Sequence, residues 1–316
     1  MPNHLVMPEP PATDTPRAPL VKKDLTADHP TWCPGCGDFA VLASYYRVLQ
    51  KFQWPHEKIL TLAGIGCSSR FPYFVNSYGA HYIHGRSLPF ATGVSLSRQD
   101  LHVVVFGGDG DGYSIGGNHL DHAARKNPHL TYIVMDNFVY GLTKKQTSPT
   151  SPIGFKSKTD PWGAVDTPVN PMRKLITSGA TFVARTHAGQ VIHMCEMMER
   201  ALLHKGFSVV EILSDCVEFY DTAFDAVTPR KGGTFSTIEL KKGDGTPEDT
   251  QRHDPSDIDA AYRLASLEWP GKFGVFYETK AATKNEKEAG IIAAARERTK
   301  NADDLTLLKR SFERMK

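Results

Sequence analysis

The sequence has no long apolar run, few cysteines and almost no net charge. No apolar stretch of the 316 residues approaches the roughly 20 residues of a membrane-spanning helix, and the amino terminus lacks a basic-then-apolar secretion signal. With a formal charge of +2, no basic surface for nucleic acid is indicated. Five cysteines in so long a chain do not predict a disulfide framework. We therefore expect a cytoplasmic protein with neither a membrane nor a nucleic acid as partner.

Alternating apolar runs and helical patterns predict an α/β fold with a mostly parallel sheet flanked by helices. We expect strands at 58–63, 103–106, 130–135, 181–186 and 207–213, and helices at 38–52, 87–98 and 189–204. Residues 1–30 are read as an extended arm, 31–228 as the main domain, and 229–316 as an extension that packs on the core or on a partner. In that extension we expect helices at 255–267 and 286–300 with a strand at 273–277 between them.

The stretch 103–137 is the most informative part of the chain. An apolar run ends in Gly107-Gly108-Asp109-Gly110, a helical segment follows, and a second apolar run ends just before Asn137. Glycines let a backbone approach phosphate oxygens, and a helix amino terminus attracts anions. Asp109 and Asn137 could then supply oxygen ligands to a Mg²⁺ shared with a diphosphate. Gly-Asp-Gly is also a common turn, but no Gly-Lys-Ser/Thr follows, so this is not a Walker loop.

Four cysteines follow strands or lie in loops beside them: Cys33 and Cys36 in a CxxC turn, Cys67, and Cys216. They could converge at the same sheet edge as the diphosphate site. An iron–sulfur cluster, a zinc site and unrelated thiols all remain open from spacing alone. One compact pair with two distant single cysteines suits a cluster held by a folded domain. Cys195 lies on the apolar face of a predicted helix, and we expect it in the core.

Together the two constellations resemble the beta subunit of the 2-oxoacid:ferredoxin oxidoreductases over residues 32–219. The shared motifs are CPGCG at 33–37, GIGCSSR at 64–70, HGR at 84–86, GGDGDGYSIGG at 107–117, DNFVYGLT at 136–143, and the lone Cys216. The resemblance implies a thiamine diphosphate-binding fold whose main domain also carries a [4Fe–4S] cluster. It implies oxidative decarboxylation of a 2-oxoacid, one-electron transfers through the cluster to ferredoxin, and acyl transfer to coenzyme A. The same reaction run in reverse would fix CO₂.

The resemblance also assigns roles to individual residues. Mg²⁺ would be held by the side chains of Asp109 and Asn137 and the carbonyl of Val139, and the [4Fe–4S] cluster by Cys33, Cys36, Cys67 and Cys216. Further cofactor contacts would come from Ile65, Gly66, Ser68, His84, Gly108, Gly110, Asp111, Gly141, Leu142 and Thr143, together with Cys67. For Asp111, a metal-bound water and a helix cap are equally good readings. His84 would act on the cofactor or its diphosphate.

Arg70 is the candidate for substrate recognition, because a guanidinium suits the distal carboxylate of 2-oxoglutarate. A solvated arginine or an internal ion pair is the plain alternative. The chain is most similar to the 2-oxoglutarate-type members. Lys144 and Lys145 could face coenzyme A, the partner subunit or solvent.

The glycine-rich core is without glutamate from residue 59 to residue 136. Thiamine diphosphate needs a carboxylate, commonly a glutamate, at its aminopyrimidine nitrogen, and the resemblance places that glutamate on an alpha subunit. We therefore expect half an active site, completed in an (αβ)₂ heterotetramer. Because no second CxxC…CxxC block is present, the chain should hold one cluster and pass electrons to an external ferredoxin.

Two other functions remain open at this point. One is a non-oxidative thiamine diphosphate decarboxylase or carboligase with a structural zinc site on the cysteines. The other is a non-catalytic subunit that carries the cofactors as a scaffold.

Overall fold

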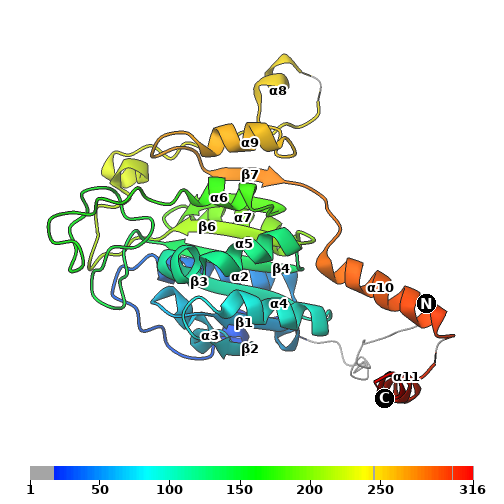
Figure 1. The fold of residues 1–316 in the computed structure, drawn as a ribbon. Coiled ribbons are helices and arrows are strands. Elements are labelled where there is room, and N and C mark those ends of the chain that lie inside the picture. The colour runs from blue at the N-terminus through cyan, green and yellow to red at the C-terminus, as the bar shows by residue number, and fades with distance from the viewer. Residues whose placement is uncertain (1–17, 245, 301, 316) are drawn as a thin grey trace.

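A single seven-stranded sheet organises the protein, shown by a computed structural model that describes residues 18–244, 246–300 and 302–315. The strands run in the order β2-β1-β3-β4-β6-β5-β7, and within these residues only β7 pairs antiparallel (Figure 1). Their bounds are β1 Ile59–Ala63, β2 Tyr78–His81, β3 His102–Gly108, β4 Leu130–Asp136, β5 Phe182–His187, β6 Phe207–Leu213 and β7 Gly274–Glu278. The prediction of a mostly parallel sheet flanked by helices is confirmed.

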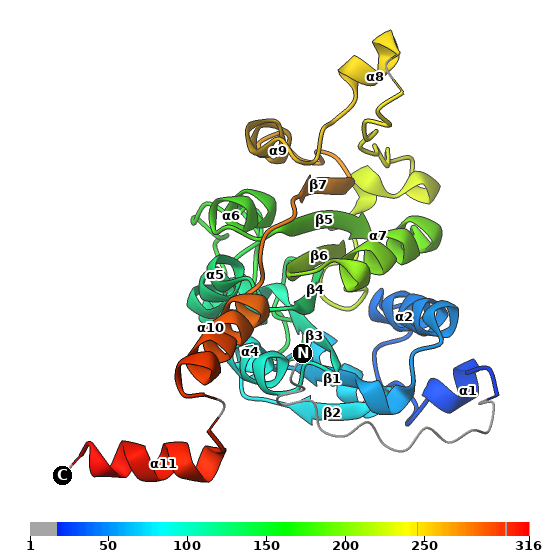
Figure 2. The ribbon, with the colours of Figure 1, turned by 90° about the vertical axis from the view of Figure 1, so that its right-hand side faces the viewer.

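Helices cover both faces of the sheet (Figure 2). One face carries α2 (Asp38–Phe52) and α7 (Val191–Leu203), and the other carries α4 (Ser87–Ser97), α5 (Gly117–Lys126) and α6 (Pro171–Thr177). The shorter or more peripheral helices are α1 (Lys22–Leu25), α3 (Phe71–Phe74), α8 (Pro247–Gln251), α9 (Ile258–Ala265), α10 (Lys284–Arg298) and α11 (Asp304–Glu313). Among the described residues, no helix is long and apolar enough to cross a bilayer.

An apolar core fills the space between the sheet and each helical layer. Under α2, the ring of Phe106 on β3 stacks on Phe71 at 4.1 Å and meets Tyr45 edge-on at 5.0 Å. Cys195 packs against this cluster from α7, with its Sγ 3.9 Å from the carbonyl of Ser44. The expectation that Cys195 belongs to the core is confirmed.

The terminal segments differ in how they meet this core. Residues 1–17 of the expected arm lie outside the described residues, whereas Leu20 and Leu25 are buried, and Ala27 N–H donates to the carbonyl of Phe74 at 2.9 Å. At the other end, β7 extends the sheet beside β5 and α9 packs on α6. Helix α10 begins where Asn285 donates to the Ser95 carbonyl at 2.7 Å, and α10 and α11 then lead away from the sheet (Figure 2).

The carboxyl ends of β1, β3, β4 and β6 lie at one edge, because these strands are parallel neighbours. The four motifs singled out in the sequence follow these ends: Gly64–Cys67, Asp109, Asn137 and Cys216. The segment 143–169, which contains neither helix nor strand, also follows this edge. In open α/β sheets this edge is where ligands bind, so the topology brings the candidate residues together.

Candidate functional site

The glycine-rich segment after β3 does not enter an α-helix directly but first makes one π-helical turn. Residues Gly110–Ile115 make a π-helical turn, and α5 begins only at Gly117. Gly110 is required by a close contact: a Cβ added there would lie 2.0 Å from Cε1 of Tyr140. The Tyr140 hydroxyl in turn lies 3.4 Å from the Gly110 carbonyl, to which it donates. π-Helical turns are rare and occur often at functional sites.

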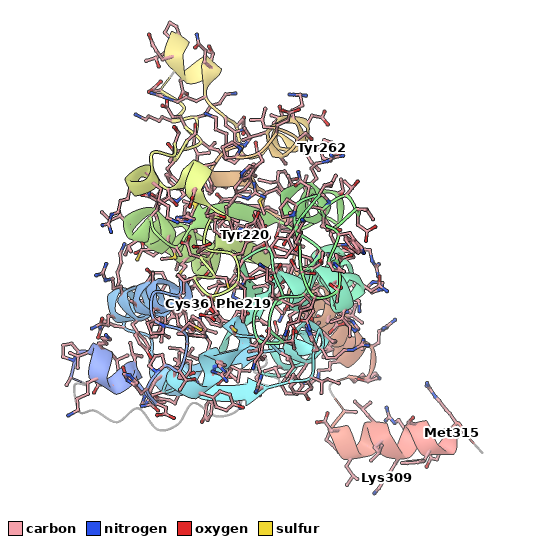
Figure 3. The ribbon with its side chains drawn as sticks, turned by 90° about the vertical axis from the view of Figure 1, so that its left-hand side faces the viewer. Cys36, Phe219, Tyr220, Tyr262, Lys309 and Met315 are labelled. Carbon is pink, nitrogen blue, oxygen red and sulfur yellow. The ribbon has the colours of Figure 1, made fainter. Side chains whose placement is uncertain are left out.

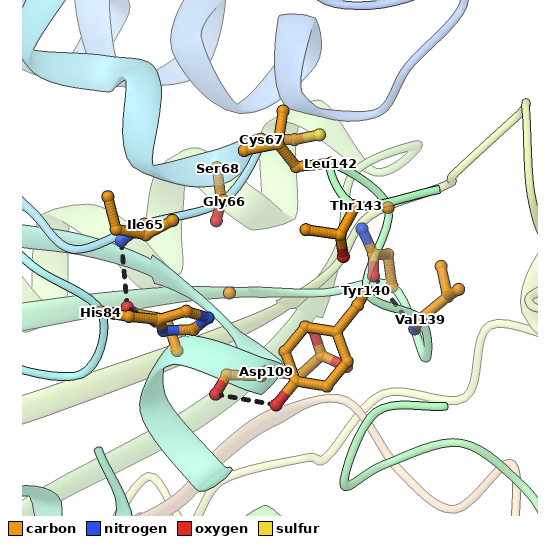
Figure 4. A pocket seen from close by; sticks show the side chains of 15 residues that line it. Ile65, Gly66, Cys67, Ser68, His84, Asp109, Val139, Tyr140, Leu142 and Thr143 are labelled. Carbon is orange, nitrogen blue, oxygen red and sulfur yellow. Dashed lines mark hydrogen bonds and ion pairs between the residues drawn. The ribbon is translucent and has the colours of Figure 1, made fainter. Parts of the chain in front are cut away.

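This turn forms one wall of a hollow at the carboxyl edge (Figure 4). Every residue expected to contact the cofactor lines it: Ile65, Gly66, Cys67, Ser68, His84, Gly108, Asp109, Gly110, Asp111, Asn137, Val139, Gly141, Leu142 and Thr143. Tyr140 also lines it and was not among the expected contacts. Tyr140 lies in the DNFVYGLT motif between Val139 and Gly141, two expected contacts, and this position could have predicted that it lines the hollow.

Asp111 holds three segments of this wall together. Its Oδ1 accepts the backbone N–H groups of Ile65 at 3.0 Å and Gly85 at 2.8 Å, and lies 2.9 Å from Nδ1 of His84. The carboxylate is buried. These contacts give Asp111 a positioning role in addition to the two roles weighed from the sequence, because it orients His84 and the loop after β1.

Asp109 and Asn137, the expected side-chain ligands of Mg²⁺, both line the glycine-rich hollow. Asp109 is buried, and burial raises its pKa, which hydrogen bonds from Ser148 and Thr150 oppose. A cation at this carboxylate would favour its charged form. Among the described residues no group of three or more His, Cys, Asp or Glu side chains could hold a metal ion. One carboxylate with amide and carbonyl oxygens still fits Mg²⁺, which commonly keeps water and substrate phosphates as ligands.

Phe138, between Asn137 and Val139, has a positive φ of 60°. This conformation costs a non-glycine residue on the order of 1–3 kcal/mol. It is held by hydrogen bonds from Phe138 N–H to Asp136 Oδ1 at 3.0 Å and from Ser151 Oγ to the Phe138 carbonyl at 2.6 Å. The reversal of the chain there places Asn137 and Val139 on the same hollow.

A second hollow, of about 300 Å³, adjoins the first and contains the four predicted ligand cysteines, Cys33, Cys36, Cys67 and Cys216. The two hollows share Cys67, Asn137, Gly141 and Leu142 as lining residues. A Cβ on Gly141 would lie 3.6 Å from Sγ of Cys216 and 3.8 Å from Sγ of Cys67. Cys36 and Phe219 are labelled in Figure 3, which views this side of the molecule. The four cysteines thus line one hollow beside the glycine-rich hollow, but among the described residues no three of them lie close enough together to hold a metal ion.

Hydrogen bonds fix the cysteine loops relative to one another. Trp32 Nε1 donates to the carbonyl of Cys67 at 2.7 Å. Ser214 Oγ donates to Oδ1 of buried Asp38 at 2.6 Å, and Gly37 N–H donates to the Asp215 carbonyl at 3.0 Å. The CxxC loop is thus tied both to the Cys67 loop and to the Cys216 loop.

The thiols of Cys36, Cys67 and Cys216 have raised pKa values and favour the neutral form when no metal is bound. Burial raises the pKa of Cys67 to about 12, and the charges of Asp38 and Cys216 add to the rise. Burial is also the main cause of the raised pKa of Cys36 and of Cys216. Thiolates here would need the positive charge of a metal centre, since a coordinating thiol is deprotonated by its metal.

Arg70 and His84 lie in different hollows. His84 lines the glycine-rich hollow, whereas Arg70 lines the cysteine hollow. The Arg70 guanidinium donates to Thr31 Oγ1 at 2.8 Å. Its positive charge partly offsets the burial that raises the pKa of Cys67. A substrate role for Arg70 stays a prediction, and in this structure its side chain faces the cysteines.

Comparison with known proteins shows the family to which the chain belongs. The family model "Thiamine pyrophosphate enzyme, C-terminal TPP binding domain" matches residues 40–212. The 2-oxoacid:ferredoxin oxidoreductase subunit beta of Saccharolobus solfataricus is 36% identical over 260 residues, which cover 81% of this chain and 84% of that subunit. The chain belongs to this family of beta subunits.

Two further members of the 2-oxoglutarate type are similar. The 2-oxoglutarate oxidoreductase subunit KorB of Mycobacterium tuberculosis is 44% identical over 235 residues, 74% of this chain and 62% of that subunit. A solved structure, 2-oxoglutarate:ferredoxin oxidoreductase from Magnetococcus marinus with 2-oxoglutarate, coenzyme A and succinyl-CoA bound, superposes with a TM-score of 0.80 at 40% identity. That match covers 92% of this chain and 95% of the other.

For a beta subunit, the composition of the glycine-rich hollow carries a consequence. None of the described residues that line it is a glutamate. The described lining of this hollow therefore contains no carboxylate of the type expected to activate thiamine diphosphate.

Gly110→Ala is expected to weaken thiamine diphosphate binding by at least about tenfold, because the added methyl group overlaps the Tyr140 ring and overpacking of this kind costs roughly 1–3 kcal/mol. The measurement is calorimetric titration of the assembled complex in the presence of Mg²⁺. Gly117→Ala is the matched control, since a Cβ there meets nothing within 4 Å. Adding Tyr140→Ala to Gly110→Ala should recover part of the loss. Equal affinities of the Gly110 and Gly117 variants would contradict this account.

Proposed function

We propose that this chain is the beta subunit of a 2-oxoacid:ferredoxin oxidoreductase that acts on 2-oxoglutarate. The reaction is oxidative decarboxylation to acyl-CoA and CO₂, with electrons leaving one at a time through a [4Fe–4S] cluster to ferredoxin, and it can run in reverse as CO₂ fixation. The observation that carries the proposal is the shared wall at Gly141, Leu142 and Cys67, because it sets a cradle for thiamine diphosphate beside four cysteines.

In this proposal the glycine-rich hollow holds the diphosphate end of the cofactor. Asp109, Asn137 and the Val139 carbonyl hold Mg²⁺, and His84 lies beside the cofactor, oriented by Asp111 at 2.9 Å. The tight packing of Tyr140 on Gly110 supports this use, since a larger residue at position 110 would displace the Tyr140 ring that lines the cradle. Bound thiamine diphosphate supplies the carbanion chemistry, and the protein binds and orients it.

The four cysteines Cys33, Cys36, Cys67 and Cys216 hold the cluster in this proposal. Their loops are fixed by the Trp32, Ser214 and Gly37 hydrogen bonds, so the ligand positions are set by the fold. Fe–S clusters are held by thiolates in this way, with potentials tuned by charge and hydrogen bonds near the sulfurs. Arg70 carries one such charge and lies beside Cys67. In this proposal it tunes the reduction potential of the cluster, in addition to the substrate role expected for it.

The partners follow from what the site contains and lacks. We infer an alpha subunit that contributes the activating glutamate in an (αβ)₂ heterotetramer, with 2-oxoglutarate and coenzyme A as substrates and ferredoxin as acceptor. The names of the relatives and the molecules bound in the Magnetococcus marinus enzyme support these partners. In this proposal the extension 229–316 packs on the cofactor domain 31–228 or on a partner, and 1–30 remains the expected extended arm. A cytoplasmic location suits cysteines that must remain reduced.

Cys216→Ala tests the cluster assignment in the complex with the alpha subunit, purified without oxygen. Wild type should contain about four iron atoms per beta subunit and absorb in the visible range, as a [4Fe–4S] centre requires. Loss of one ligand should remove most of that iron and most ferredoxin reduction. Cys195→Ala, in the core, should keep both. A colourless wild-type protein that binds zinc would contradict the proposal and favour a non-oxidative decarboxylase.

A further inference from the structure

We propose that the loop 143–169 is the docking surface for the alpha subunit and that it links docking to the Mg²⁺ ligand Asp109. The inference rests on the proposed function, because it takes the alpha subunit to be the chain that completes the cofactor site. The loop has an outer face of exposed apolar side chains and an inner face that touches both candidate sites.

The outer face is formed by Ile153, Trp162 and Val165, called here the Trp162 patch. Their exposed fractions are 66%, 94% and 84%. Two hydrogen-bonded stretches of the loop bring them together, since Gly154 N–H donates to the Ala164 carbonyl at 2.7 Å. A Cβ on Gly163 would lie 3.1 Å from Cα of Gly154. In Figure 1 this green loop extends beyond the carboxyl edge of the sheet.

An exposed tryptophan flanked by two exposed β-branched residues is typical of a protein interface. Clustered apolar side chains on a surface mark interaction sites, whereas single ones need no explanation. Tryptophan is enriched among the few residues that carry most of the energy of an interface. The patch therefore fits a partner with a complementary apolar pocket.

The inner face of the loop packs against ligands of both proposed metal centres. Phe155 and Ala164 form a buried cluster with Val139, and Cys216 packs against it. The ring of Phe155 lies 4.7 Å from that of Tyr220, which follows the cysteine loop. A partner that binds the Trp162 patch would therefore bind a segment whose inner face contacts both sites.

Thr150 provides the contact with Asp109. Its Oγ1 lies 2.8 Å from Oδ2 of Asp109 and 2.7 Å from Oδ1 of Asp136. A hydroxyl donates one proton and can accept others, so Thr150 donates to one of these buried carboxyl groups and accepts from the other only when that group is protonated. A shift of the loop would move this hydroxyl relative to both carboxyl groups, and Thr150 is therefore a positioning residue for Asp109.

The position of the patch favours the alpha subunit as its occupant. The chain that supplies the missing carboxylate must cover the carboxyl edge, and the Trp162 patch projects from that edge. Helices α10 and α11 also carry exposed apolar residues, among them Ile291 and Phe312, but both helices lie on the opposite side of the molecule from the loop in Figure 1. A second copy of this chain bound there would leave the cofactor hollow open.

Trp162→Ala tests docking by sedimentation velocity titration against the alpha subunit. The expected result is a loss of affinity of about 30-fold, as for an interface hot spot. Ile192→Ala, equally apolar and exposed on α7, is the control and should change affinity less than about threefold. Unchanged affinity of Trp162→Ala would overturn the docking surface. So would a loss only of self-association, which would make a second copy the occupant.

Thr150→Val tests the link to Asp109. Calorimetry measures Mg²⁺-dependent thiamine diphosphate binding with and without the alpha subunit. Wild type and Thr150→Ser should bind the cofactor at least about tenfold more tightly with the alpha subunit, whereas Thr150→Val should lose most of that gain but still bind the alpha subunit. A full gain in Thr150→Val would overturn the link. Failure of the proposed function is separate: there, the wild-type complex itself neither binds thiamine diphosphate nor reduces ferredoxin.

Discussion

The buried carboxylate of Asp111 is the constraint on which the site depends. Its Oδ1 gathers the loop after β1, the His84 loop and the π-helical turn after β3 into one wall. The glycines around it are there for steric reasons, since a Cβ on Gly64 would lie 2.2 Å from Oδ1. A buried carboxylate with several donors is expensive to disturb, because removing it leaves those donors unsatisfied. The positions of the three segments that form this wall therefore depend on the Asp111 side chain, which could fix them without touching the cofactor.

The second constraint is the wall that the two hollows share. Gly141 lines both hollows, and a Cβ there would be in ordinary contact with the sulfurs of Cys67 and Cys216. The loop 143–169 begins just after this wall and returns to it through Thr150 and Phe155. Cofactor binding, the cysteine centre and the exposed edge are thus parts of one connected structure.

Much of this arrangement could be predicted from the sequence. The bounds of α2 and β6 agree with their predicted ranges, because α2 has helical apolar spacing and β6 is a short, mostly apolar run. The motifs fall at strand ends that parallel pairing brings to one edge. Short elements such as β2 and α3 were missed because a few residues carry no periodic signal. The contacts of Asp111 and the turn of Tyr140 onto Gly110 depend on the packing of distant segments. The hydrogen bond from Arg70 to Thr31 likewise joins distant segments, although Arg70 follows Cys67 by three residues in the sequence.

The account's central claim is that the cradle and the four cysteines work as one oxidative half-site that needs a second chain. The most direct test is electron paramagnetic resonance of the protein purified without oxygen, frozen after addition of 2-oxoglutarate and coenzyme A. The account predicts the signal of a reduced [4Fe–4S] cluster when the alpha subunit is present and none when this chain is alone. Substrate-dependent reduction by this chain alone, or an intact complex with no iron signal even after chemical reduction, would contradict it.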